Sequence, residues 1–134
     1  MTWSEASCFL QGPSFSPRTV EDSTELFFLE KNEPGEIGQI GRFRNKPIPY
    51  GSSTLSPPFQ ATTENPYYGV EWLIDIILAK RQFLVIAGAI DIILRLNVYH
   101  DGQCNLEFDQ GILKKIGDGN IVLTISCYED ANYV

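Results

Sequence analysis

Ten consecutive residues, 90–99, alternate between two kinds of side chain, and this run constrains the fold more than any other feature. One phase is wholly aliphatic, whereas the other is mixed and mostly polar: Ile90, Ile92, Leu94, Leu96 and Val98 against Asp91, Ile93, Arg95, Asn97 and Tyr99. Successive side chains of a strand point to opposite faces of a sheet. We therefore predict a strand with one face in a hydrophobic core.

The residues before this strand predict a long, largely buried helix. Asn65 is a good N-cap residue and Pro66 suits the first helical position, while Gly88 suits the C-terminus. At roughly twenty residues the helix is about 30 Å long. Apolar side chains recur along it at helical spacing: Val70, Leu73, Ile74 and Ile77, widened by Trp72, Ile76 and Phe83.

The residues after the strand predict a hairpin, a short helix and a closing strand. Asp101-Gly102 is a strong turn signal, and the alternating Cys104, Leu106 and Phe108 favour a return strand. Asp109 is suited to cap a helix that continues through Ile116. Four residues on the apolar phase of the last strand are expected to face the core: Ile121, Leu123, Ile125 and Cys127.

The N-terminal half carries weaker patterns. We predict a strand over 3–11, with Ala6, Cys8 and Leu10 on one face. Ser16-Pro17 marks the start of a helix that extends to about Leu29, with Val20, Phe27 and Phe28 inward. Residues 31–65 are rich in Pro and Gly and are expected to be irregular, with an edge strand near 40–44. A loop of this length in a small domain is more often functional than not.

Together these elements predict one α+β domain spanning 1–134. Its architecture is a two-layer sandwich, in which a mainly antiparallel sheet packs against one long helix and one or two short ones. A chain of 134 residues buries a sufficient core without disulfides or metal.

Charge and cysteine content exclude several classes of function. Ten Lys and Arg against 17 Asp and Glu give a net charge of −7, which disfavours direct nucleic-acid binding and docking on an anionic membrane. Cys8, Cys104 and Cys127 are scattered, form no C-x-x-C pair, and are expected to be buried structural thiols. We therefore expect no metal and no cofactor.

The first residues lack the pattern of a signal peptide, so we expect a cytoplasmic protein.

The order of elements, with several local sequences, resembles a bacterial family of small domains of unknown function. The resemblance rests on Phe15-Ser16-Pro17, on 105–108 (Asn-Leu-Glu-Phe), on the helix 112–116 (Ile-Leu-Lys-Lys-Ile) and on the strand 123–128. Some members of that family lie beside toxin genes and look like immunity proteins of the contact-dependent growth inhibition type. The resemblance implies an immunity protein that binds a toxin, and it implies no catalytic residues.

The charge map suggests where such a partner would bind. Residues 21–36 hold six carboxylates against Lys31 alone, so this segment contributes −5 of the net −7. An acidic segment attracts a basic partner, such as a nuclease toxin, over long range. A basic island with aromatic residues follows at 42–50. The candidate partner-binding residues are Glu21, Asp22, Glu25, Glu30, Glu33, Glu36, Arg42, Arg44 and Tyr50.

Two alternatives from other classes stay open. His100 is the only histidine, so a small hydrolase or transferase would use it with Asp101 or Glu129. The other reading of His100 is an exposed turn residue. The third possibility is a structural dimer in which two copies pair through an exposed edge strand.

Overall fold

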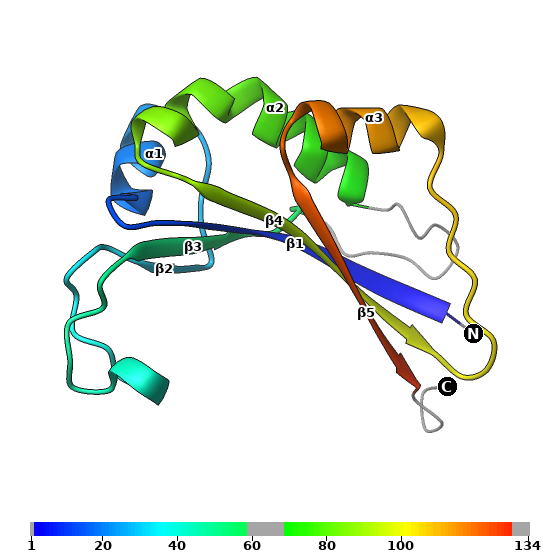
Figure 1. Ribbon diagram of the computed structural model, residues 1–134, viewed down its shortest axis with the longest axis horizontal. Helices are drawn as coiled ribbons and strands as arrows, with labels where there is room; N and C mark the ends of the chain where they lie inside the picture. The colour runs from blue at the N-terminus through cyan, green and yellow to red at the C-terminus, as the bar shows by residue number, and fades with distance from the viewer. Residues whose placement is uncertain (1, 59–68, 130–134) are drawn as a thin grey trace.

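The structure, a computed structural model, describes residues 2–58 and 69–129 as two layers (Figure 1). A five-stranded sheet forms one layer, with the strand order β2-β3-β1-β4-β5, and three helices form the other. The predicted α+β sandwich is confirmed. The elements are β1 (Thr2–Gly12), α1 (Pro17–Ser23), β2 (Glu30–Asn32), η1 (Gly41–Phe43), β3 (Gly51–Leu55), α2 (Val70–Ile86), β4 (Asp91–His100), α3 (Gln110–Asp118) and β5 (Val122–Glu129).

The centre of the sheet consists of the two strands with the clearest alternation. β1 pairs antiparallel with the whole length of β4, from Thr2 opposite His100 to Gln11 opposite Asp91. The predicted inward residues of both strands are buried beneath the helices: Ala6, Cys8 and Leu10 of β1, and Ile92, Leu94, Leu96 and Val98 of β4. The alternating pattern therefore identified the covered side of the sheet correctly. Ile90, which precedes β4, is exposed.

The hairpin predicted at Asp101-Gly102 is wrong. β4 has β1 on one side and β5, in parallel, on the other, so neither edge is free for a return strand. Residues 103–109 form no strand and instead carry the chain back to α3. A crossover of this kind is what a parallel pair requires. The alternation at 104–108 nevertheless indicates which side chains face inward, because Cys104, Leu106 and Phe108 are half-buried against the core.

The two helices that flank β4 have somewhat different bounds from those predicted. α2 begins at Val70, and the predicted start at Asn65 and Pro66 lies outside the described residues. α3 has the predicted N-cap, since the side chain of Asp109 accepts a hydrogen bond from the backbone N–H of Ile112 at 2.8 Å. It ends at Asp118, two residues after the expected Ile116.

Burial along α2 is less complete than predicted. Val70, Leu73, Ile74, Ile77 and Leu84 are buried. The last turn, however, leaves apolar side chains in solvent, and these are Phe83, Val85 and Ile86.

The end of α2 depends on glycine, as the sequence indicated. Gly88 has φ = +101°, a left-handed conformation that disfavours residues with a Cβ. A Cβ at this position would also lie 2.7 Å from the carbonyl oxygen of Ser14. This close approach seats the β1–α1 turn against the end of α2, where the Ser16 N–H donates to the carbonyl of Ala87 at 2.9 Å.

α1 is shorter than predicted, because Thr24 ends it. The Thr24 hydroxyl donates to the carbonyl of Val20 at 2.8 Å and accepts from the N–H of Leu26 at 3.1 Å. The chain is then extended, so adjacent side chains point in opposite directions. As a result Phe28 is buried but Phe27 is 67% exposed, which corrects the prediction that both face inward.

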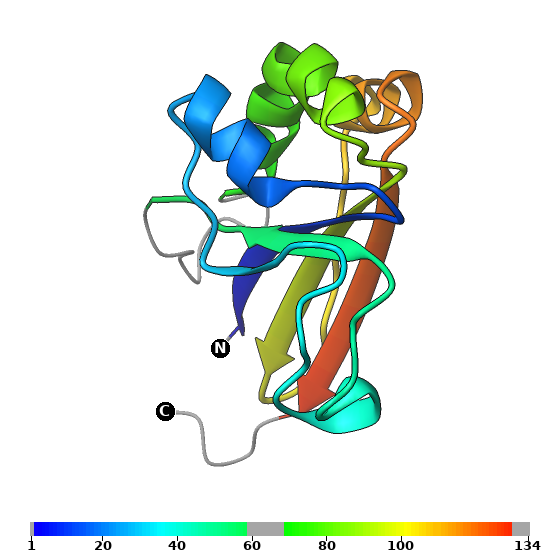
Figure 2. The same ribbon diagram turned by 90° about the vertical axis from the view of Figure 1, so that its left-hand side faces the viewer.

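Residues 31–65 are more ordered than predicted as far as they are described. β3 pairs antiparallel with both β1 and β2. The edge strand expected near 40–44 is wrong, because 41–43 form the 3-10 helix η1. Residues 33–50 make a projecting arm, closed by reciprocal hydrogen bonds such as Gly38 N–H to the carbonyl of Lys46 at 2.9 Å. Figures 1 and 2 show the arm extending from the sheet on the side away from the helices.

β5 is an outer strand and is poorly covered. Of the four residues expected to face the core, Ile121 is buried and Leu123 is half-buried, but Ile125 and Cys127 are exposed. Figure 1 shows the reason, since α3 lies above the start of β5 only. The prediction that Cys127 is a buried thiol is therefore wrong, whereas Cys8 is buried and Cys104 is half-buried.

Candidate partner-binding surfaces

The acidic residues of 21–36 do not form one continuous patch. Lys31 lies opposite the buried Ser53 in the β2–β3 pair and therefore on the helix side of the sheet. Its neighbour Glu30 must then point to the other face. The segment thus divides between the two sides of the molecule.

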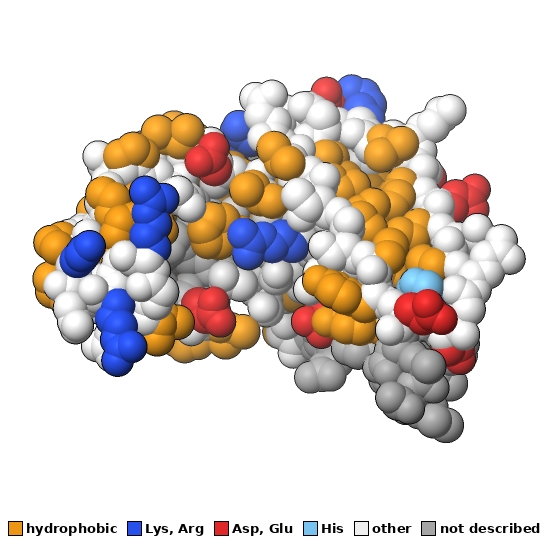
Figure 3. Space-filling model, turned by 60° about the horizontal axis from the view of Figure 1, so that its bottom comes forward, with side chains coloured by type: hydrophobic (Ala, Val, Ile, Leu, Met, Phe, Trp, Pro, Cys, Tyr) orange, Lys and Arg blue, Asp and Glu red, His pale blue; other side chains and the backbone are white. Residues whose placement is uncertain are grey.

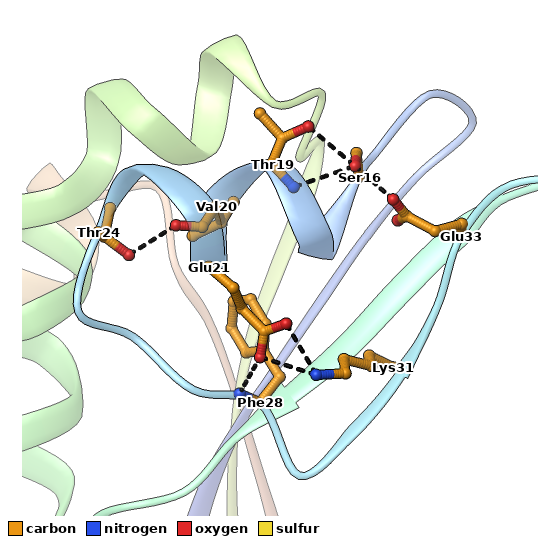
Figure 4. A network of polar contacts seen from close by, with 8 residues as sticks. All are labelled: Ser16, Thr19, Val20, Glu21, Thr24, Phe28, Lys31 and Glu33. Atoms are coloured by element: carbon orange, nitrogen blue, oxygen red, sulfur yellow. Dashed lines mark hydrogen bonds and ion pairs between the residues drawn. The ribbon is translucent and has the colours of Figure 1, made fainter.

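The carboxylate of Glu21 is bound by hydrogen bonds within the chain (Figure 4). Its carboxylate accepts two hydrogen bonds from Lys31 Nζ, at 2.7 and 2.9 Å, and a third from the N–H of Phe28 at 3.0 Å. Desolvation raises the pKa of Glu21, but the Lys31 and Phe28 hydrogen bonds and the Lys31 charge outweigh it. The pKa of Glu21 is therefore below its ordinary value. This side chain holds α1 to the chain that leads into β2.

Two further carboxylates of the segment have partners within the chain. Ser16 Oγ, the N-cap of α1, donates to Glu33 Oε1 at 2.5 Å (Figure 4). Glu25 accepts hydrogen bonds from its own backbone N–H and from Lys80 of α2, 3.0 Å away, and both lower its pKa. Exposed pairs of this kind contribute little to stability.

Three carboxylates remain for a partner. The side chains of Asp22, Glu30 and Glu36 are exposed, and their carboxylates have no hydrogen-bond or ion-pair partner among residues 2–58 and 69–129. Glu36 also lines a cavity of about 210 Å³ between α1 and the base of the arm. The other residues that line it are Pro17, Arg18, Glu21, Lys31, Asn32 and Glu33.

The predicted basic island lies on the projecting arm and extends from its tip at Arg42 to its base at Tyr50. Arg42 lies over the ring of Phe43, 5.5 Å from its centroid, and Phe43 packs edge-on against Tyr50 at 5.8 Å. Arg44 is exposed beside them. The arm thus brings Arg42, Arg44 and Tyr50 together, as their spacing suggested. It holds them apart from the carboxylates of α1.

A second surface is the side of the sheet that the helices leave uncovered. We call it the open face, and it consists of the outward-pointing residues of β1, β4 and β5. Phe9, Ile93 and Val122 form one row across it, because Phe9 pairs with Ile93 and Ile93 pairs with Val122. Figure 3 views this side and shows hydrophobic side chains gathered around a cationic one. The open face is an amphipathic surface.

Two ring contacts organise the open face. The Arg95 guanidinium lies 4.4 Å from the centroid of the Phe9 ring, a cation–π geometry. Tyr99 and Tyr128 stack at 5.3 Å with an interplanar angle of 21°. Tyr128 is about half exposed, and Arg95 is exposed as well. Arginine and aromatic side chains are the residue types that dominate protein–protein interfaces.

The open face was not predicted as a site from the sequence. A signal was present, because Ile93 and Tyr99 are large apolar or aromatic residues on the phase of β4 that should be polar. Their importance depends on which strands lie beside β4, and the local pattern does not encode that.

His100 lies at the end of β4. Its Nδ1–H donates to the carbonyl oxygen of Gly102 at 2.6 Å, which closes the turn that follows. In the parallel register His100 lies opposite Glu129 of β5. Among the described residues, no group of three or more His, Cys, Asp or Glu side chains could hold a metal ion.

None of the helices in the described ranges combines the length and apolar character needed to cross a membrane. Comparison of the chain with family models, with curated proteins and with solved structures found no match.

Proposed function

We propose that this protein is a non-enzymatic binding protein of the immunity type, which neutralises a bacterial toxin by forming a stoichiometric complex. The observation that carries the proposal is the open face. It presents arginine and stacked aromatic side chains on rigid strands instead of covering them with a second helix layer. Monomeric proteins rarely leave such a surface without a partner.

Charge supports a basic partner. The net charge of −7 steers a positively charged protein toward the chain. Glu30 of β2 points to the same side of the sheet as Arg95, so it places a carboxylate beside the open face. The negative electrostatic potential of the chain attracts a basic toxin, such as a nuclease, and repels a polyanion.

The open face and the arm act together in this proposal. Figure 1 shows the arm projecting on the same side of the sheet as the open face. A partner seated on Arg95 and Phe9 would then also meet Arg42 near the tip of the arm and Tyr50 at its base. We assign the main contact to the open face, because β1 and β4 hold it rigidly at the centre of the sheet.

Co-expression with a candidate toxin, encoded by a gene adjacent to the one for this chain, tests the proposal. We expect growth to be rescued and the two proteins to elute together as a complex. Arg95→Glu should abolish both effects, because it removes the guanidinium that lies over the Phe9 ring at the centre of the open face and places a carboxylate against that ring. The idea fails if the wild-type chain neither rescues growth nor binds.

His100→Ala separates this function from a hydrolase or transferase. His100 pairs with Glu129 in the β4–β5 register, so these are the two side chains that the enzymatic alternative would use. A binding protein should tolerate His100→Ala with growth rescue intact. Loss of rescue by a variant that still binds the toxin would favour the enzyme.

A further inference from the structure

The outer edge of the sheet at β5 is a second place where the chain is incomplete. β5 pairs with β4 on one side, and among the described residues no strand pairs with its other side. The exposed edge is eight residues long. Unpaired N–H and C=O groups along such an edge are a template for another strand.

β5 also lacks the features that normally protect an edge strand. Residues 122–128 contain no charge, no Pro and no Gly, and Val122, Ile125 and Tyr128 are substantially exposed. The opposite edge is different. β2 has only three residues and carries Glu30 and Lys31, so it is short and charged. One edge of the sheet is therefore protected against pairing, whereas the other is open to it.

We propose that β5 pairs antiparallel with β5 of a second copy of this chain. An uncharged strand can pair with itself without placing like charges opposite each other. With Ile125 on the twofold axis, Val122 lies opposite Tyr128 of the other copy and Thr124 lies opposite Ser126. β-Branched–aromatic and hydroxyl pairs of this kind favour antiparallel strands. Glu129, the first charge of β5, falls beyond the paired residues.

This dimer joins the two sheets into one of ten strands, five from each copy. The open faces become continuous across the axis, and β2 forms both outer edges. Because each arm lies between β2 and β3, the two arms stand at opposite ends of the joined sheet. The proposal is independent of the identity of the toxin and concerns the purified protein alone.

Sedimentation velocity on the purified chain tests this dimer. We expect the wild type to sediment as a dimer that dissociates on dilution. Ile125→Lys and Ile125→Glu each place like charges opposite each other at the axis, so each variant alone should be monomeric. An equimolar mixture of the two should dimerise again, because the charges are then opposite. Ile40→Lys, a matched change at an exposed residue of the arm, should remain a dimer.

Three results would overturn the proposal: a wild type that is monomeric at every concentration, an Ile125→Lys variant that dimerises like the wild type, or a mixture that stays monomeric. Hydrogen exchange on the wild type gives an answer that does not depend on how the variants fold. Amides of 122–128 should become more protected as protein concentration rises. Protection that is independent of concentration would contradict β5 pairing.

Discussion

The two faces of the sheet are built from alternate residues of the same strands, yet they have different roles. On the helix side, Leu94 and Leu96 are buried beneath α2 and contribute to the free energy of folding. On the other side, Arg95 lies between them in sequence and is exposed against Phe9. Folding therefore depends on one phase of β4, while the other phase is free to serve recognition.

The thiols should show the contrast most strongly. Burial raises the pKa of Cys8, on the covered face, to about 12, although the Arg95 charge opposes the effect. Relative to the ordinary value of 9.0, this lowers the thiolate fraction at pH 8 about a thousandfold. In the native protein, a thiol reagent should therefore modify the exposed Cys127 at once and leave Cys8 unmodified until the chain unfolds. Rapid reaction of Cys8 in the native state would show that the helix layer does not seal this face.

Substitutions on adjacent residues of β4 should differ in their effect on stability. Leu96 has 0% exposure, and Leu96→Ala should lower the free energy of unfolding by about 2–5 kcal/mol, through lost burial and a cavity. Arg95→Ala should lower it by about 1 kcal/mol or less, since it removes only an exposed cation–π contact. Urea denaturation measures both values. Equal losses would mean that the open face also supports the fold.

The contact between the β1–α1 turn and the end of α2 should be sensitive to a single added methyl group at Gly88. We expect Gly88→Ala to destabilise the protein by about 1–3 kcal/mol, because the left-handed backbone and the Ser14 carbonyl both oppose a Cβ. Gly117→Ala is the matched control. That residue lies in α3 with open space where a Cβ would be placed, so the substitution should be neutral or stabilising by about 0.5–1 kcal/mol. Thermal unfolding of the two variants gives the comparison.

The Glu21 network should produce the smallest effect, visible only in acid. Because the pKa of Glu21 is lowered on folding, its contribution to stability is fully present above the pKa of the unfolded chain. That contribution is lost as the pH falls through the lower, folded value. We expect Glu21→Gln to flatten the acid limb of a stability profile measured by urea denaturation. The neighbouring exposed Asp22→Asn should leave that limb unchanged, and an equal change in both variants would contradict the assignment.

Local patterns predicted the elements that are locally encoded. The alternation of 90–99 identified β4 and its buried face, and Ser16-Pro17 and Asp109 marked two helix starts correctly. These signals work because period and capping are properties of a few adjacent residues. They fix where an element lies and which of its faces is apolar.

The wrong predictions concern elements that depend on pairing between segments distant in the sequence. β3, with the sequence Gly-Ser-Ser-Thr-Leu, has little apolar character and becomes a strand because β1 and β2 pair with it. Asp101-Gly102 is a strong hairpin signal, but β1 and β5 already occupy both edges of β4. Tertiary pairing overrides local preference in both cases.

The candidate site residues also include some that the sequence placed correctly and some that it did not. Arg42 and Tyr50 are close in sequence, and the structure connects them on the arm through the ring of Phe43. The carboxylates of 21–36 are equally close in sequence, yet not all of them are available to a partner. Lys31 donates hydrogen bonds to Glu21, and Ser16 donates one to Glu33. Linear clustering of charge does not reveal which charges the chain itself will use.

The affinity of this protein for the toxin proposed as its partner, measured by isothermal titration calorimetry, is the direct test of the division between the two faces. We expect Arg95→Glu to weaken binding at least tenfold while the thermal midpoint stays close to that of the wild type. Unchanged affinity in a folded Arg95→Glu variant would contradict it, because the open face would then not be the surface that binds.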